Sequence, residues 1–358
     1  MMKVGIIAAN KLRFSPYAFF YADILRELGI DYEFVVPDRS KETRDESDEK
    51  IRTVPWNEGL HNLVNYSIFS ARVRRICKQS YDFVIVLTAP NAVFFAPWIT
   101  RLFPQKYIVD IRDYTFEKYG LYRAMEKIAF QSSAMNVISS PEFTTFLPES
   151  TYYVTHNITT PLSASSAKFK KNTAHIIIGY VGSIGYAEQC EKMIELVAKD
   201  ARFSFLFYGT GDDEERLKRY VSERNYGSDR IRFFGAYKPD QKSAILRKVD
   251  ILFNCYGNGS TGVRCLLANK LYDGLYYHIP ILNSPNTYMD KMSGKLSYAL
   301  DLEKEKNLDG LWSWYQNLDG QEVDLYADRT YQEMAAQNMR TKAAIVDILK
   351  KVQKNSKI

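Results

Sequence analysis

The chain has 358 residues, of which 46% are hydrophobic and 25% are charged. This length predicts two domains of about 150 residues each, and the composition is that of a globular protein. The formal net charge is only +6, and 19 basic residues stand against 18 acidic ones before position 161. So small an excess argues against a nucleic-acid-binding protein, whereas its concentration in the second half suits a small anionic ligand there.

Cysteines and histidines form no pattern typical of disulfides or metal sites. The four cysteines lie far apart, and the four histidines stand singly. We therefore expect reduced core cysteines in a cytoplasmic protein, with no metal and no other cofactor. The apolar run 4–9 is too short for a signal peptide, and the most apolar later stretch, 91–103, is shorter than the about 20 residues of a membrane span.

Aromatic side chains are abundant, with 26 tyrosines and 20 phenylalanines. Most are expected in the core, because large aromatic rings favour burial. Two clusters, at residues 17–21 and 94–98, have an alternative interpretation. They could rest on a lipid surface as a peripheral membrane contact, or touch an amphiphilic acceptor.

In the first half, short apolar runs alternate with segments of helical length. The expected strands are 3–10, 32–36, 83–88, 107–111, 136–139 and 152–154, and the expected helices are 16–28, 61–78, 91–103 and 121–132. The charged stretch 38–50 has no apolar periodicity, which predicts a mobile loop. Strands separated by helices, several of them continuous apolar runs, predict a parallel doubly wound sheet.

Residues 161–173 interrupt this alternation, because they are rich in Ser and Lys and poor in apolar residues, and they indicate a linker. The expected strands beyond it are 176–181, 203–208, 231–233, 251–253 and 281–282, and the expected helices are 188–198, 213–223, 240–247, 263–277 and 331–352. The sequence thus predicts an α/β protein with Rossmann-like domains over 1–160 and 174–325 and a C-terminal helical segment over 326–358. Two such domains would face a cleft, with ligand sites in the loops after strands.

Two glycine turns follow strands of the second half. Gly182-Ser183 comes directly after a strand and would let a sugar phosphate approach the backbone, although a tight strand-to-helix turn is the alternative. The G-x-G-x-x-G pattern of a dinucleotide site is not formed, which disfavours a dehydrogenase. Gly209 follows the next strand and also permits close approach of a ligand. The acidic run 213–215 after it favours a structural role, at the start of a helix.

The segment 258–284 combines a small polar loop with a predicted helix. The loop contains Ser260, Thr261 and Gly262, and a helix that begins there offers unpaired backbone N–H groups to a phosphate. Arg264, in the first turn, could add a charge-assisted hydrogen bond. We therefore expect a phosphate-binding loop here.

Lys270 and Asp273 lie three residues apart in the same predicted helix, close enough to share one face. One interpretation is that they hold the phosphates and the ribose of a nucleotide. The alternative is an exposed ion pair on the helix surface.

Arg112 and Asp113 close a strand of the first half, in the motif DIRD over 110–113. In one interpretation they are catalytic groups, with a carboxylate that orients an acceptor hydroxyl or acts as a base. In the other they form a solvated ion pair of about 0–1 kcal/mol.

The order of these motifs resembles the retaining GT-B glycosyltransferases, and within them the large family four (glycosyl transferases group 1). The resemblance covers nearly the whole chain. The motifs that carry it are 110–113 (DIRD), 154–157 (VTHN), 180–183 (YVGS), 207–211 (FYGTG), 234–235 (FG) and 269–282 (NKLYDGLYYHIPIL).

This resemblance implies a retaining, metal-independent glycosyltransferase. A nucleotide-sugar donor would bind to the second domain, and a glycan or lipid-linked acceptor to the first. The C-terminal helix over 326–358 would pack back toward the first domain. Asp273 takes the place of the glutamate that binds the ribose hydroxyls, while Gly182, Ser183 and the loop 260–264 fall where the diphosphate and sugar are held. The setting would be bacterial capsule, O-antigen or exopolysaccharide synthesis, in the cytoplasm or peripherally at the inner face of the cytoplasmic membrane.

One position departs from the family. Its earlier glutamate would fall at Cys265, which cannot contact sugar hydroxyls as a carboxylate does. The alternative function is therefore a catalytically impaired nucleotide-sugar-binding or partner subunit of a polysaccharide assembly system.

Overall fold

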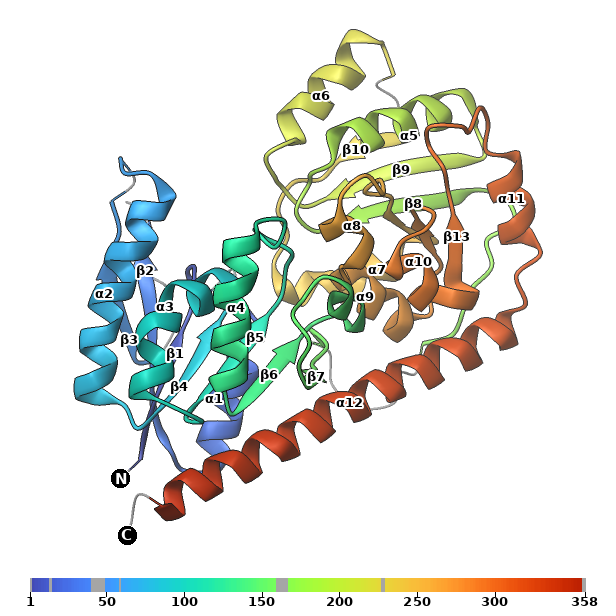
Figure 1. Ribbon diagram of the computed structural model, residues 1–358. Helices are drawn as coiled ribbons and strands as arrows, with labels where there is room; N and C mark the ends of the chain where they lie inside the picture. The colour runs from blue at the N-terminus through green and yellow to red at the C-terminus, as the bar shows by residue number, and fades with distance from the viewer. Residues whose placement is uncertain are drawn as a thin grey trace. The chain divides into compact units, whose positions relative to one another are not determined.

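The computed structural model describes residues 2–12, 15–39, 49–57, 59–158, 167–226 and 229–355. The chain folds into two compact units (Figure 1). Unit 1 comprises Met1–Asn157 and Ala336–Ile358, and unit 2 comprises Ile158–Ala335. Each unit has one parallel sheet with helices on both faces, which confirms the predicted α/β class with two doubly wound domains.

Unit 1 has a seven-stranded sheet in the order β3-β2-β1-β4-β5-β6-β7, in which every neighbouring pair is parallel. Its strands are β1 (Lys3–Ile7), β2 (Asp31–Asp38), β3 (Ile51–Pro55), β4 (Phe83–Leu87), β5 (Tyr107–Ile111), β6 (Met135–Ile138) and β7 (Tyr152–Val154). Its helices are α1 (Ala18–Glu27), α2 (Asn62–Ser80), α3 (Ala89–Leu102), α4 (Gly120–Ser132) and the short 3-10 helix η2 (Pro141–Thr145). The strand order reverses between β1 and β4, which is where doubly wound sheets bind ligands.

Strand β1 shows how the unit 1 sheet is covered on both faces. Val4 and Ile6 point to one face and join the core formed with α1 and the end of the last helix. Gly5 points to the other face, where a Cβ atom would lie 2.5 Å from the ring of Tyr81. A glycine is therefore required there, because any side chain would collide with that ring.

Unit 2 has a six-stranded parallel sheet in the order β10-β9-β8-β11-β12-β13. Its strands are β8 (Ile176–Val181), β9 (Phe203–Tyr208), β10 (Ile231–Phe233), β11 (Ile251–Asn254), β12 (Ile281–Asn283) and β13 (Ser297–Ala299). Its helices are α5 (Ala187–Lys199), α6 (Glu214–Glu223), α7 (Lys242–Leu246), α8 (Thr261–Cys265), α9 (Asn269–Tyr277), α10 (Tyr288–Ser293) and α11 (Asp309–Gln316), with the 3-10 helices η3 (Pro239–Gln241) and η4 (Gly294–Leu296). Here the order reverses between β8 and β11.

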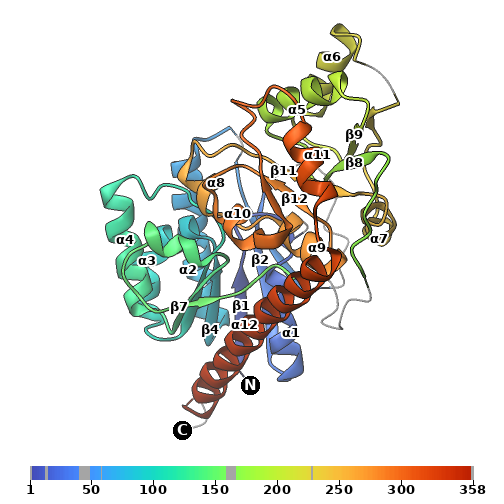
Figure 2. The same cartoon turned by 90° about the vertical axis from the view of Figure 1, so that its right-hand side faces the viewer.

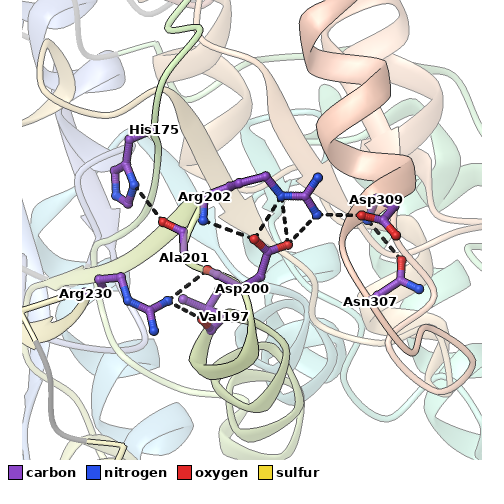
Figure 3. A network of polar contacts seen from close by, with 8 residues as sticks. All are labelled: His175, Val197, Asp200, Ala201, Arg202, Arg230, Asn307 and Asp309. Carbon is purple, nitrogen blue, oxygen red and sulfur yellow. Dashed lines mark hydrogen bonds and ion pairs between the residues drawn. The ribbon is translucent and has the colours of Figure 1, made fainter.

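A polar network connects the amino ends of strands in the unit 2 sheet to the neighbouring helices (Figure 3). Arg230 donates to the carbonyls of Val197 at 2.7 Å and Asp200 at 2.8 Å, which satisfies the last carbonyls of α5. Arg202 pairs with the carboxylates of Asp200, at 2.7 Å, and Asp309, at 2.5 Å. These contacts tie α5, β9 and α11 together and leave the carboxyl ends of the strands to the loops described below.

The predicted helix over 263–277 is wrong in one respect, because the structure divides it into α8 and α9. Residues 266–268 between them are extended and pack against the apolar core of unit 2. Burial of this Leu-Leu-Ala segment therefore overrides its helical preference. Strands β3 and β13 and helices α10 and α11 were not expected from the sequence pattern.

Two predicted connections lie partly outside the described residues. These are the stretch 38–50, of which 40–48 is not described, and the linker 161–173, of which 161–166 is not described. In the described part of the second, the backbone N–H of Phe169 donates to Asp324 at 2.8 Å.

The last helix, α12 (Gly320–Asn355), is unbroken over 36 residues (Figure 2). It starts earlier than the predicted 331, because the carboxylate of Asp319 accepts hydrogen bonds from the N–H groups of Gln321 and Glu322 and caps the first turn. Its apolar stripe belongs to unit 2 through Met334 and to unit 1 from Ile345 onward.

Candidate functional site

The loops at the strand-order reversal of unit 2 enclose a cavity of about 450 Å³. It is lined by residues that follow β8, β11, β12 and β13, among them Tyr186, Tyr256, Ser260, Ser284 and Asp301. The rings of Tyr186 and Tyr256 stack in parallel, with their centroids 4.1 Å apart. Since ligands of doubly wound sheets bind beside this reversal, the cavity is the candidate site of unit 2.

The two glycine turns after β8 and β9 pack directly on each other. Gly182 has φ +125° and Gly209 has φ +131°, both in the region that favours glycine. A Cβ on Gly209 would lie 1.9 Å from the carbonyl oxygen of Gly182, so close packing explains that glycine. No described atom lies within 4 Å of the corresponding position on Gly182, and Ser183 beside it is exposed. Of the two turns, the first is the one that a ligand can reach.

The predicted phosphate loop is held by its own side chains. Ser260 caps α8 by accepting a hydrogen bond from the N–H of Val263 at 3.2 Å. Arg264 is exposed, and its guanidinium donates to the carbonyl of Asn258 at 3.0 Å and to the hydroxyl of Thr261 at 3.2 Å. Gly262 is half-buried within α8. Arg264 therefore shapes this loop, in addition to any role with a ligand.

Lys270 is a buried cation, with 5% of its surface exposed. Its ammonium donates to the hydroxyl of Tyr256 at 2.6 Å and lies 4.1 Å from the ring centroid of Tyr180. Within the described ranges, no carboxylate lies within 4 Å of this ammonium. Burial lowers its pKa. The charge of Asp273 acts on the ammonium from beyond ion-pair distance and raises its pKa. A buried cation that contacts π-faces and a hydroxyl but no carboxylate is arranged to receive an anion.

Asp273 is buried too, and its carboxylate accepts from the ammonium of Lys242 on α7 at 2.7 Å. Burial raises the pKa of Asp273, while the charge of Lys242 acts in the opposite direction. The exposed Lys270–Asp273 pair considered from the sequence is therefore wrong, since each side chain is buried and has its own partner. The partners Lys242, Tyr256 and Tyr180 were not singled out from the sequence, although Tyr180 stands in the YVGS motif.

In unit 1, Arg112 at the end of β5 is part of a buried network. Its guanidinium donates to the carboxylate of Asp110 at 2.6 Å and to the hydroxyl of Thr155 at 2.7 Å, and it lies 4.5 Å from the ring centroid of Tyr17. The same oxygen of Asp110 accepts from the hydroxyl of Tyr21 at 2.6 Å. Burial opposes the charge of Arg112, but Asp110 outweighs it and raises the pKa of the guanidinium. The carboxylate of Asp110 therefore fixes the position of the Arg112 guanidinium.

Asp113 stands apart from this network. Its side chain is exposed, and no hydrogen bond or ion pair links it to a described residue. The surrounding protein desolvates the carboxyl and raises its pKa, while Arg112 lowers it. The solvated Arg112–Asp113 pair considered from the sequence is not formed, because Arg112 pairs with Asp110. The catalytic role of Asp113 and Arg112 stays a prediction.

Thr88, at the end of β4, is a strained residue beside this network that sequence reasoning missed. It has φ 79° and ψ 144°, a conformation in which residues other than glycine are rare. Its N–H donates to the carbonyl of Asp110 at 2.7 Å, and its buried hydroxyl has no partner among the described residues. Thr88 thus combines backbone strain with an unsatisfied hydroxyl at the strand-order reversal of unit 1. No sequence pattern pointed to this residue, because a β-branched side chain at the end of an apolar run predicts ordinary extended backbone.

In the residue ranges that the structure describes, no group of three or more His, Cys, Asp and Glu side chains is placed to hold a metal ion. No helix in those ranges combines the length and the apolar character needed to cross a bilayer.

Comparison with known proteins gives likenesses of structure alone. No protein-family model matches the chain, and no curated protein matches it. Among solved structures, Anabaena HepE in complex with UDP and glucose is similar with a TM-score of 0.67 and 11% identity, over 98% of this chain and 100% of that one. The apo form of WaaB, a lipopolysaccharide outer core galactosyltransferase, is similar with a TM-score of 0.65 and 12% identity, over 96% and 99%.

A third similar structure, from Listeria monocytogenes, is described as a UDP-N-acetylglucosamine 2-epimerase. It has a TM-score of 0.61 and 13% identity, over 98% of this chain and 97% of that one. At these identities the likeness establishes the fold: the chain has the two-domain GT-B fold. Structures described as a galactosyltransferase and as an epimerase both resemble this chain, so function has to be argued from the site.

Proposed function

We propose that this protein is a glycosyltransferase that moves a sugar from a nucleotide-sugar to a glycan or lipid-linked acceptor. Unit 2 would hold the donor and unit 1 the acceptor. The observation that carries this proposal is the buried Lys270 ammonium, which faces aromatic rings and a hydroxyl and has no carboxylate within 4 Å among the described residues. A departing nucleoside diphosphate is the anion that such a cation stabilises best during glycosyl transfer.

The other predicted donor residues fit this role in different ways. The open backbone turn at Gly182 and Ser183 suits a phosphate or sugar oxygen. Asp273 would bind the ribose hydroxyls through the carboxylate oxygen that does not accept from Lys242. Ser260 and Thr261 would border the sugar, with Arg264 holding their loop.

Retention of the anomeric configuration, independence from metal and a place in polysaccharide assembly are parts of the same proposal, and they rest on the sequence resemblance. HepE was solved with UDP and glucose, and WaaB is named as a galactosyltransferase. By analogy, UDP-sugars are the first donors to test. An acceptor carried on a lipid would bring the protein to the inner face of the cytoplasmic membrane by peripheral contact.

The test begins with equilibrium binding of UDP, UMP and uridine, and of the guanine series, to the full chain. We expect the diphosphate of one series to bind most tightly, because Lys270 needs an anionic partner. Turnover is then measured over a panel of nucleotide-sugars, with the product anomer read by NMR and EDTA added in parallel. Conversion of the donor into an epimeric nucleotide-sugar, rather than transfer, would overturn the proposal in favour of an epimerase.

A second candidate, a non-catalytic nucleotide-sugar-binding or partner subunit, is favoured by one position. Cys265 is buried in α8, where the resembling family carries a carboxylate. Tight binding of a nucleotide-sugar without hydrolysis or transfer would support this candidate. A Cys265→Glu variant that then gained activity would identify the missing carboxylate as the cause.

A further inference from the structure

Unit 1 carries a second large cavity, away from the strand ends. It measures about 1140 Å³, above the usual volume of a small-molecule site, and lies along α2, α3 and the segment that enters α4. Helix α3 packs against both α2 and α4 in this part of the molecule (Figure 1). Its lining is mostly apolar and includes Leu63, Tyr66, Phe94, Trp98, Phe116 and Tyr119.

The helix periodicity of the sequence produces this groove. On α2, residues 63, 67, 70, 71 and 74 line it, and on α3, residues 90, 93, 94, 97 and 98 do so, in both cases at the spacing of a single helix face. The α2 face combines small side chains with the larger Leu63, Tyr66 and Arg74, and the α3 face is aromatic and proline-rich. The cluster at 94–98 was expected from its composition to be mostly core, and Phe95, Ala96 and Trp98 are indeed buried. Of this cluster, Phe94, Pro97 and the buried Trp98 line the groove.

The rim of the groove is apolar and exposed to solvent. Leu121 at the start of α4 is 79% exposed, and Leu63 on α2 and Phe116 and Tyr119 before α4, which also line the groove, are exposed as well. A contiguous apolar surface of this kind on a water-exposed helix layer marks a site for an apolar partner.

The charge on the α2 wall of the groove is positive. Helix α2 carries Arg72, Arg74, Arg75 and Lys78 and no acidic residue. Arg74 is exposed and itself lines the groove, and it makes no hydrogen bond or ion pair with any described residue. An occupant complementary to this surface is apolar along its length and negatively charged at one end.

We infer that this groove binds an anionic phospholipid of a membrane surface, with one acyl chain along α2 and α3 and the phosphate against Arg74. Apolar burial provides the affinity for the chain, and the basic face of α2 provides the selectivity for an anionic headgroup. This gives the peripheral membrane contact proposed above a place on unit 1. The inference rests on the proposed function, but lipid binding is measured without glycosyl transfer. A failure of the lipid-binding inference can therefore be distinguished from a failure of the proposed transferase activity.

The experiment uses the full chain with vesicles of phosphatidylcholine alone or mixed with phosphatidylglycerol. Flotation measures binding, and phosphatidylglycerol brominated along its acyl chain reports proximity to tryptophan by quenching. We expect binding that requires phosphatidylglycerol and quenching that is largely lost in Trp98→Phe, because Trp98 lines the groove.

The charge requirement is tested with matched variants on one helix. Arg74→Glu is expected to weaken vesicle binding about tenfold, equivalent to about 1.4 kcal/mol, whereas Arg75→Glu, which does not line the groove, should weaken it far less. Circular dichroism serves as the control for folding of the variants. Equal loss in both variants, unchanged quenching in Trp98→Phe, or no preference for phosphatidylglycerol would each overturn the inference.

Discussion

Each unit has a buried cation near its strand ends, but only the cation of unit 1 is paired with a carboxylate. In unit 1, Arg112 is paired at 2.6 Å with Asp110, and Tyr21 and Thr155 complete the network. In unit 2, Lys270 has the hydroxyl of Tyr256 and aromatic faces around it, and no carboxylate of the described chain within 4 Å. A closed pair stabilises the fold, whereas an open cation keeps part of its interaction energy for a ligand. The following predictions test this contrast.

The largest effect is expected from Arg112→Met. It leaves the fully buried carboxylate of Asp110 without its cation, a change that costs about 3–5 kcal/mol. Urea denaturation followed by circular dichroism measures the loss, and Arg101→Met, an exposed arginine on α3, is the control. A loss within 1 kcal/mol of the control would show that the pair does not hold unit 1 together.

Lys270→Met makes the corresponding change in unit 2, and here stability should not fall. The affinity for a nucleoside diphosphate should instead drop by about 10–100-fold, because a charge-assisted bond of about 1.5–3 kcal/mol is lost. Titration calorimetry measures the affinity, with Lys248→Met, an exposed lysine, as control. Because burial lowers the pKa of Lys270, affinity in the wild type should also decline at a lower pH than for an exposed lysine. A destabilised variant with unchanged affinity would reverse the contrast.

Unit 1 is not paired throughout, because it also contains Glu126 on α4, a buried acid without an ion-pair partner among the described residues. Both its carboxyl oxygens are buried without a partner among the described residues, and burial, then the charge of Glu117, raises its pKa to about 8. The folded state therefore keeps a proton that the unfolded chain loses near pH 4.5, so this group lowers stability as pH rises from about 4.5 to about 8.

Glu126→Gln should remove this part of the pH dependence. At pH 8 and above it should be more stable than the wild type by about 1–3 kcal/mol, the cost of a buried charge without a partner. Thermal unfolding over a pH series measures the slope. The exposed Glu149→Gln should retain the wild-type slope, and a Glu126→Gln curve parallel to the wild type would show that the carboxyl is paired in solution.

Tyr256→Phe removes the hydroxyl that accepts from Lys270 and leaves the ring. Because the donor is a charged ammonium, loss of this hydrogen bond corresponds to about 1.5–3 kcal/mol of stability. Tyr153→Phe, at an exposed tyrosine, is the matched control for denaturation. A loss above 3 kcal/mol would mean that Lys270 depends on this hydroxyl as Arg112 depends on Asp110, and the contrast between the units would vanish.

The alternation of strands and helices was predictable because it depends on short-range pattern. Continuous apolar runs such as 83–87 can only be buried strands in a sheet covered on both faces. The early start of α12 was also visible in principle, since Asp319 stands one residue before it and caps it. Strand β3 was missed because Arg52 and Pro55 interrupt its apolar pattern.

The site was predictable only in its position along the chain. Of the predicted donor residues, Ser260 lines the candidate cavity, whereas Gly182, Lys270 and Asp273 do not. Lys270 is connected to the cavity through its hydrogen bond to Tyr256, which does line it. The partners of Asp273 and Lys270 were not predictable, because Lys242 lies 31 residues from Asp273 and Tyr256 lies 14 from Lys270. The division of the helix at 266–268 depends on packing against the core, which no local pattern reports.

Helix α12 determines whether the two units can be separated by proteolysis. Val323 and Ala327 of the helix complete one core, while Ile345 and Leu349 complete the other. Neither unit can therefore be released intact by a single cut between the sheets. Removal of the helix from Ile345 onward would uncover the sheet of unit 1, which is built from strands more than 180 residues earlier in the sequence.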